Sequence, residues 1–453
     1  MSQFLNRKSL VKQGLALSVA ALMMTAANAA TDKEEIQKLR QEVEQLKSLI
    51  SQQQQVQQQQ QVQLQQVQSR PPVQTPAQAP TLAGLFSKNG ANVNLYGFVR
   101  ADAEYAFKGG NGIFNKPNAV DLNGVPDANG ILNPNSDRFY TAVTASRIGL
   151  DFKAPVQGAD VGGKIEIDFR NNDSVRIRHA YMTYNNWLIG QTTSSFLSTE
   201  TQPEMIDFGS PLGIGTFRTP MVRYSDKIDA NTQYALGLEQ GRNDNRLPSA
   251  TAKISHKFAG GDGLVTARAL VQETRARLDS DVIKHTTAYN NVVIDKAAEY
   301  NDKTDFSWGV GLGANYKLGE KLIFNADYSH VKGDDKYLLY SDNLAYNTTN
   351  NGRDIDLIDL DAFTVGVTYK FNPKWRSTLG YGAIFADGAK AKQNDQIQQG
   401  WLNVLYNPVK PITLGAEYVY SERDANLVKG ADGLTKDRTG RDSRLGLMAK
   451  YDF

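Results

Sequence analysis

Sixteen segments of the chain alternate apolar and polar residues, and the links between them follow a pattern of length. The segments begin near residues 93, 139, 161, 175, 186, 219, 231, 248, 263, 305, 320, 361, 374, 396, 410 and 442. Side chains point alternately to the two faces of a strand, so each segment predicts a strand with one apolar face and one polar face. Links from even to odd segments are short, whereas several links from odd to even segments are long, namely 107–138, 194–218, 276–304, 334–360 and 422–441. Short turns at one end and long loops at the other are typical of an outer-membrane barrel, and a soluble sandwich has no reason to separate them.

The last segment shows the alternation most clearly. One parity holds Leu445, Leu447, Ala449, Tyr451 and Phe453, and the other holds Arg444, Gly446, Met448, Lys450 and Asp452. A terminal Phe also resembles the signal that directs bacterial barrels to their assembly machinery. An even strand number places both ends of the barrel at its short-turn, periplasmic side. Arg444 is then expected near the extracellular start of its strand, away from any constriction.

Four regions are predicted along the chain. Residues 1–29 have the basic start, apolar run and Ala27-Asn28-Ala29 cleavage site of a signal peptide. Residues 30–68 form a coiled-coil arm, residues 69–91 a Pro/Gln-rich linker, and residues 92–453 the barrel. The apolar run of the signal peptide is too short to serve as a membrane anchor, and no later stretch reaches the ~20 apolar residues of a membrane helix.

The coiled-coil arm is predicted from heptad spacing. Its apolar seam consists of Ile36, Leu39, Val43, Leu46 and Ile50. Glu35 with Arg40, and Glu42 with Lys47, occupy g and e positions that pair between parallel helices, so the arm favours parallel self-association. The seam then passes through a glutamine tract. We expect this tract to continue the helix, and the alternative is a disordered low-complexity segment.

Several chemistries are disfavoured by composition and spacing. The chain has no cysteine, which excludes disulfides and thiolate sites, and a net charge of +2 gives no global signal for nucleic acid. The four histidines fit no zinc motif, and His179 falls on an apolar parity that suggests an interfacial position. Gly309-Val-Gly-Leu-Gly313 lies in mid-strand and does not open a helix, so it is not a phosphate loop. We therefore expect neither an enzyme nor a bound cofactor.

A barrel of this size encloses an aqueous channel, so selectivity requires a constriction. The loop between the fifth and sixth segments, 194–218, is the candidate, and an ordinary surface loop is the alternative. It carries Glu200, Glu204, Asp207 and Arg218, together with a glycine-rich run that lets the backbone fold tightly against the wall.

Arginines on the polar parity of the wall would complete the constriction opposite the loop. Lumen-facing bases from the first six strands are Arg100, Arg147, Lys164, Arg170, Arg176, Arg178 and Arg223, with Arg268, Arg376 and Arg444 as weaker candidates from later strands. A guanidinium binds a carboxylate through two parallel hydrogen bonds and stays charged at any working pH. Acidic residues share the same parity, so some arginines must be paired across strands. Arg147, Arg178 and Arg223 are the strongest candidates for solute contact.

The order of these features resembles the DcaP-like family of trimeric outer-membrane porins of Gram-negative bacteria. The resemblance is carried by Leu95-Tyr-Gly-Phe-Val-Arg-Ala-Asp102, Ser146-Arg-Ile-Gly-Leu-Asp-Phe-Lys-Ala-Pro155 and Asn185-Asn-Trp-Leu-Ile-Gly-Gln-Thr-Thr193. It covers essentially the whole mature chain, and the order of the motifs is more specific than any one of them. It implies a homotrimer and uptake of small organic anions, notably dicarboxylates.

The resulting expectation is an all-β, 16-stranded antiparallel transmembrane β-barrel with an N-terminal periplasmic α-helical coiled-coil arm. Its function would be passive diffusion of small hydrophilic solutes, with organic anions preferred at an arginine-lined constriction. Its partners would be anionic solutes, outer-membrane lipid, lipopolysaccharide and further copies of the chain, but no nucleic acid. The alternatives are a structural or adhesive barrel with a plugged pore and, with no supporting motif, a barrel enzyme.

Overall fold

The computed structural model describes residues 92–453, except 111, 115, 157, 172–173, 210, 280–299 and 351–353. The predicted signal peptide, coiled-coil arm and linker lie outside the described residues, so these three regions stay predictions. None of the helical segments in the described part of the chain has the length and hydrophobicity needed to span a bilayer.

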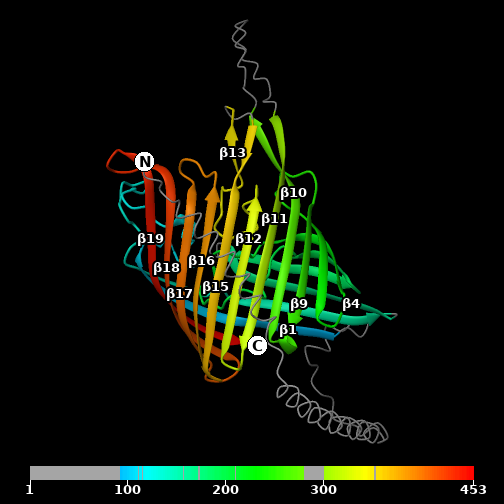
Figure 1. The fold of residues 1–453 in the computed structure, drawn as a ribbon. Helices are drawn as coiled ribbons and strands as arrows, with labels where there is room; N and C mark the ends of the chain where they lie inside the picture. The colour runs from blue at the N-terminus through cyan, green and yellow to red at the C-terminus, as the bar shows by residue number, and fades with distance from the viewer. Residues whose placement is uncertain are drawn as a thin grey trace, which may run out of the picture. The chain divides into compact units, whose positions relative to one another are not determined.

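The described chain is built almost entirely from β-strands (Figure 1). The strands are β1 (Asn92–Lys108), β2 (Arg138–Ala142), β3 (Arg147–Val156), β4 (Ala159–Asn171), β5 (Ser174–Tyr184), β6 (Trp187–Thr193), β7 (Arg218–Lys227), β8 (Thr232–Glu239), β9 (Ser249–Phe258), β10 (Gly263–Asp279), β11 (Tyr300–Leu318), β12 (Leu322–Lys332), β13 (Tyr346–Thr349), β14 (Asp354–Leu357), β15 (Asp359–Asn372), β16 (Trp375–Asp387), β17 (Asn394–Tyr406), β18 (Ile412–Lys429) and β19 (Thr435–Asp452). Two short 3₁₀ turns, η3 (Pro117–Ala119) and η4 (Ala259–Gly261), lie in connections.

The strands close into a barrel of sixteen antiparallel positions. One sheet contains seventeen strands, but β2 and β3 both pair with β1, at Asp102–Ala106 and at Asn92–Phe98 respectively. They are therefore two halves of one interrupted barrel strand. The barrel closes where β19 pairs with β1, and the Phe453 N–H donates to the Gly97 carbonyl at 3.0 Å. The predicted barrel with sixteen strands, closed between the first and last strands, is confirmed.

Two of the expected long loops are wrong in extent. Residues 422–441 form mostly paired strand, from Glu422 opposite Arg441 to Lys429 opposite Thr435. Similarly, β10 continues to Asp279 and β11 begins at Tyr300, inside the expected loop 276–304. Strands that extend past the membrane have no lipid-facing side, so the apolar alternation that marks them in the sequence is lost. The connection between β12 and β15 remains long and contains the β13–β14 hairpin, although β15 begins at Asp359, just inside the expected loop 334–360.

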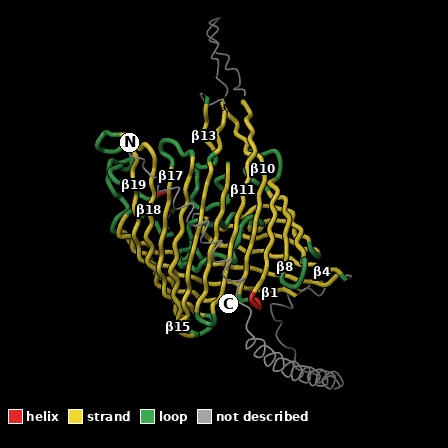
Figure 2. The backbone as a smooth tube through the Cα atoms, viewed as in Figure 1, coloured by secondary structure: helices red, strands yellow, loops and turns green. Residues whose placement is uncertain are grey.

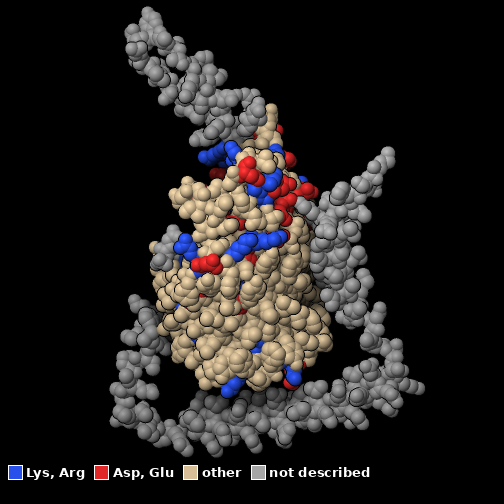
Figure 3. All heavy atoms as spheres, turned by 90° about the vertical axis from the view of Figure 1, so that its left-hand side faces the viewer, with Lys and Arg blue, Asp and Glu red and all other residues tan. Residues whose placement is uncertain are grey.

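The outer face of the barrel has the alternation expected of a lipid-facing wall. On β19, Leu447 and Tyr451 are about half exposed, at 52% and 49%, whereas Arg444 is 1% exposed. Figure 3 shows a broad uncharged belt on the side of the molecule that includes β18 and β19, with charged side chains mainly above it and a few at the lower rim. Paired aromatic rings lie near the short turns, such as Trp375 and Tyr406 at 4.4 Å between centroids. Aromatic rings of this kind are typical of the membrane interface.

The hydrophobic core lies inside the barrel, where two loops pack against the wall. It contains Phe196 and Leu212 from the loop after β6, Tyr337 from the loop after β12, and inward residues of later strands such as Ile384. Figure 2 shows strands in yellow and loops in green, with loop segments inside the outline of the strands. The core therefore fixes loops within the lumen, where they position a constriction.

Candidate functional site

The loop between β6 and β7, here called loop 3 (residues 194–217), is anchored to the opposite wall. The backbone N–H groups of Ile206 and Asp207 donate to the two carboxylate oxygens of Glu417 on β18, at 2.8 and 2.6 Å. The Leu212 N–H donates to Gln399 Oε1 on β17 at 3.1 Å. The wall formed by β15 to β19, here called the far wall, lies far from β6 and β7 around the barrel. Because loop 3 bonds to β17 and β18 of this wall, it crosses the lumen.

Two acids of loop 3 form ion pairs with bases of the barrel wall, Glu200 with a base on the nearby strand β9 and Glu204 with a base on the distant strand β16. Glu200 accepts from Lys253 Nζ at 2.9 Å, and Glu204 forms two bonds of 2.7 Å with Arg376. Burial raises the pKa of the Glu200 carboxyl, but the Lys253 ammonium outweighs burial, so the pKa lies below its ordinary value. Glu204 therefore tethers loop 3 to the far wall, and Glu200 tethers it to the nearer strand β9. Among the described residues, neither acid is ion-paired with Arg147, Arg178 or Arg223.

Asp207 makes the most buried ion pair of loop 3. Its Oδ2 lies 2.6 Å from Nη2 of Arg444, whose side chain is 1% exposed. Asp442 and Glu104 lie 3.3 and 3.9 Å from the same guanidinium. The expected position of Arg444 away from the constriction is therefore wrong. The physical reason is that loop 3 descends into the barrel far enough to reach the inner face of β19.

Glycines on the inner face of the far wall make room for loop 3. A Cβ atom at Gly382 would lie 2.1 Å from the Leu212 carbonyl oxygen, and one at Gly366 would lie 2.4 Å from Pro203 Cβ. Gly309 and Gly313 of β11 face Phe196 and Thr201 in the same way, at 3.0 and 2.8 Å. The Gly309–Gly313 segment is in mid-strand as predicted, and its role is to accommodate the loop.

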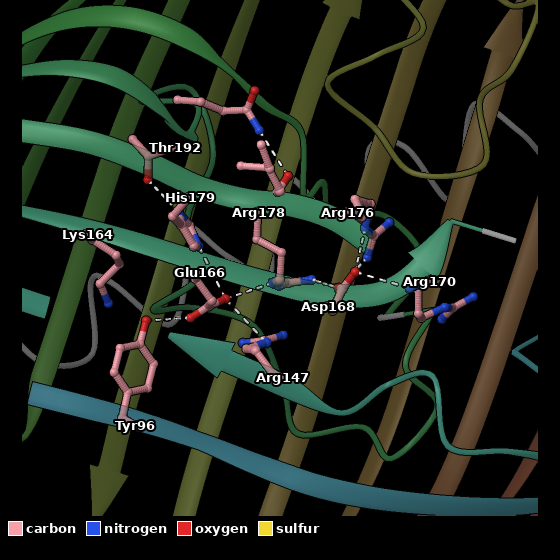
Figure 4. Close-up of polar contacts among 12 residues, drawn as sticks. Tyr96, Arg147, Lys164, Glu166, Asp168, Arg170, Arg176, Arg178, His179 and Thr192 are labelled. Atoms are coloured by element: carbon pink, nitrogen blue, oxygen red, sulfur yellow. Dashed lines mark hydrogen bonds and ion pairs between the residues drawn. The ribbon is translucent and has the colours of Figure 1, made fainter. Parts of the chain in front are cut away.

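The side of the lumen formed by β3, β4 and β5 carries a cluster of arginines (Figure 4). This cluster, here called the basic wall, consists of Arg147, Arg170, Arg176 and Arg178. Arg178 donates to Glu166 at 2.8 Å and to Asp168 at 2.7 Å, and Arg176 makes two bonds to Asp168 at 2.8 and 2.6 Å. Arg147 Nε lies 3.3 Å from Glu166. Three guanidinium groups thus share two carboxylates, which leaves net positive charge on this wall.

A β-bulge shapes the basic wall. In the β4–β5 ladder, Glu166 lies opposite His179, while the next residue, Ile167, lies opposite Ile177. Arg178 is the extra residue, and a bulge of this kind turns neighbouring side chains to the same face. His179 Nε2 consequently lies 3.8 Å from Glu166 inside the barrel. The expected interfacial position of His179 is therefore wrong, because strict alternation does not hold across the bulge.

The remaining predicted residues differ in their surroundings. Arg100 binds Asp102 through two nitrogens, at 2.9 and 2.6 Å, and also donates to the Ile206 carbonyl of loop 3 at 2.5 Å. Arg223 donates to the Thr193 carbonyl at 3.5 Å. Among the described residues, Arg218 and Arg223 have no carboxylate within 4.0 Å.

Sequence reasoning gave too little weight to one base, Arg170 of β4, and missed two rings beside it. The guanidinium carbon of Arg170 lies 4.4 Å from the ring centroid of Phe114, in the loop after β1, and 5.3 Å from that of Phe208 in loop 3. The alternation of β4 identified Arg170 as lumen-facing. Nothing in the sequence indicates that aromatic residues from two separate loops pack against it.

The arrangement is suited to attracting and orienting small anions. Positive charge on one wall of a narrow lumen raises the local concentration of anions, and guanidinium groups bind carboxylates with defined geometry. Within the described ranges, no group of three or more His, Cys, Asp or Glu side chains is placed to hold a metal ion. Sixteen strands, an apolar outer face and a lumen narrowed by a loop define an outer-membrane β-barrel channel.

The chain belongs to the DcaP outer membrane protein family, whose profile matches residues 18–453. The outer membrane channel DcaP of Acinetobacter baumannii is 39% identical, with a TM-score of 0.68, and the match covers 82% of this chain and 100% of that one. The search of curated proteins found no match.

More distant structures share the fold. An anion-selective porin from Comamonas acidovorans is 13% identical with a TM-score of 0.53, and the match covers 80% of this chain and 100% of that one. OmpT, an outer membrane protein of Vibrio cholerae, is 15% identical with a TM-score of 0.51, and the match covers 81% and 99% of the two chains.

Proposed function

We propose that the protein is a passive diffusion porin of the outer membrane that prefers small organic anions, dicarboxylates among them. The observation that carries this proposal is the pairing pattern in the lumen. The acids of loop 3 are paired with bases outside the basic wall, namely Lys253, Arg376 and Arg444. By contrast, Arg147, Arg176 and Arg178 share Glu166 and Asp168. An anion passing loop 3 therefore meets net positive charge, and successive arginines offer weak sites that allow it to leave again.

This arrangement of arginines favours a solute that carries two negative charges. Arg147, Arg218 and Arg223 retain donors that are not fully used by carboxylates, so both ends of a dicarboxylate can find guanidinium partners. A monoanion gains one such interaction and a neutral solute none. The proposed order of permeation is dianion, then monoanion, then neutral solute of equal size.

Swelling of liposomes that contain the purified protein tests this order. Succinate is expected to enter several-fold faster than a neutral diol of the same length, because a single unit charge at about 4 Å is worth about 1 kcal/mol in water. Liposomes without protein are the control. Equal rates for both solutes would contradict the anion preference, and the absence of any swelling or ohmic current steps would support a plugged barrel instead.

We also propose that the protein is a homotrimer whose predicted coiled-coil arm self-associates in the periplasm. The support is the heptad seam in residues 31–50 and the resemblance to trimeric porins. The mass of the detergent-solubilised protein, measured by light scattering, is expected to equal three chains. A variant lacking residues 31–67 is expected to form a less stable oligomer, and an unchanged oligomer would show that the arm is dispensable for assembly.

A further inference from the structure

The guanidinium of Arg170 differs from those of the other arginines on the basic wall. Arg147, Arg176 and Arg178 each have a carboxylate within 3.3 Å. Among the described residues, by contrast, no carboxylate oxygen lies within 4.0 Å of the Arg170 side chain. Only its backbone N–H reaches Asp168, at 3.3 Å, and Figure 4 shows its guanidinium turned away from that acid.

Aromatic rings take the place of an acid at Arg170. Phe114 lies 4.4 Å and Phe208 lies 5.3 Å from the guanidinium carbon, and the two ring centroids are 5.9 Å apart. Ring faces attract a cation without accepting its N–H hydrogen bonds in the way a carboxylate does. Arg170 is therefore held in place while its donors stay available, whereas Arg176 and Arg178 use theirs on Asp168 and Glu166.

Phe208 has a second role in the cluster. Its ring centroid lies 5.3 to 5.8 Å from four guanidinium carbons, those of Arg100, Arg147, Arg170 and Arg178. The ring is only half-buried and stands on loop 3 beside Gly209. The ring therefore occupies the space between the four guanidinium groups, where a carboxylate would be most strongly attracted.

We propose that Arg170, clamped by Phe114 and Phe208, is a carboxylate-binding site of the constriction, and that the Phe208 ring controls access to it. This proposal rests on the proposed function and adds where an anion is held and which side chain it must displace. Carboxylate oxygens would accept from the free N–H edge of Arg170, and the methylene chain would contact the rings.

The test uses full-length protein in planar bilayers, with succinate added to a KCl solution that carries the current. Succinate held in the pore reduces the chloride current, so the concentration for half-maximal reduction reports affinity. Arg170→Gln is expected to raise this concentration by about tenfold, because a charge-assisted paired hydrogen bond is lost. Arg170→Lys keeps the charge but not the planar fork and is expected to raise it by about threefold.

Variants at Phe208 distinguish the effect of its aromatic ring face from the effect of its side-chain volume. Phe208→Ala is expected to increase the chloride conductance and to weaken succinate binding, because both the obstruction and the clamp are removed. Phe208→Leu is expected to keep the conductance and still weaken binding, since only the aromatic face is lost. Arg441→Gln, on the exposed outer side of β19 beside Glu422, is the matched control and is expected to leave both values unchanged.

The outcomes distinguish this proposal from the proposed function. An unchanged half-maximal concentration in both Arg170 variants, in a pore that still prefers anions, would overturn the Arg170 site alone. A pore that prefers cations before any substitution would overturn the proposed function itself. Weaker succinate binding in Arg170→Gln together with retained anion preference supports both.

Discussion

Replacing Arg444 with alanine is expected to loosen loop 3 around Asp207 and to destabilise the barrel. Arg444 is the buried cation beside Asp207, Asp442 and Glu104, at 2.6, 3.3 and 3.9 Å. Its loss leaves buried carboxylates uncompensated, which costs about 3–5 kcal/mol for one broken buried pair. The expected results are a lower temperature for loss of the folded band on gels and a larger, noisier single-channel conductance.

A matched exposed ion pair provides the control for Arg444. Arg441 binds Glu422 at 2.8 Å on the outer side of the barrel, and its side chain is 50% exposed, so Arg441→Ala is expected to change neither quantity appreciably. If Arg444→Ala also kept the conductance and thermal stability of the unmodified protein, the account of loop anchoring would be wrong.

A steric change tests the same anchoring by another route. Gly382→Ala places a Cβ atom 2.1 Å from the Leu212 carbonyl oxygen and must displace loop 3. Gly400→Ala, on the next strand, meets nothing closer than 3.9 Å. Altered conductance is therefore expected for the first variant and not for the second.

Replacing Arg178 with glutamine is expected to reduce the preference for anions. Arg178 neutralises both Glu166 and Asp168, at 2.8 and 2.7 Å, so its loss leaves these carboxylates with Arg147 and Arg176 only. A unit charge about 4 Å from an ion is worth about 1 kcal/mol in water, so chloride permeability should fall about fivefold and the ratio of chloride to potassium permeability by at least that factor. Reversal potentials under a KCl gradient measure this ratio.

Arg178→Lys is the matched variant that separates charge from hydrogen-bond geometry. It keeps a cation between Glu166 and Asp168, so most of the anion preference should remain. A permeability ratio in Arg178→Gln equal to that of the unmodified pore would show that the basic wall does not set the selectivity.

The barrel could be predicted from sequence because membrane and lumen impose a strict pattern on each strand. Leu445, Leu447, Tyr451 and Phe453 face outward on the last strand, and Arg444 faces inward, as the alternation indicates. The pattern ends where the membrane ends, so the extensions of β10, β11, β18 and β19 were missed. Local alternation carries no information about strands that meet water on both faces.

The detail of the constriction depends on contacts between residues far apart in the chain. Strand parity places Arg444 in the lumen and the inward fold expected of loop 3 places Asp207 there, but their contact depends on how deeply loop 3 descends. The bulge at Arg178 similarly changes the facing of His179 without any mark in the sequence. Inward glycines on β11, β15 and β16 are a signal that could have been used, because they mark the surface that receives the loop.

The reversal potential of the unmodified, purified pore between KCl solutions of different concentration shows which of the two ions the lumen favours. With Arg147, Arg176 and Arg178 sharing two carboxylates in the lumen, chloride is expected to permeate faster than potassium. The measured potential should therefore have the sign of an anion-selective pore. A potential of the opposite sign, with potassium permeating faster, would contradict the account.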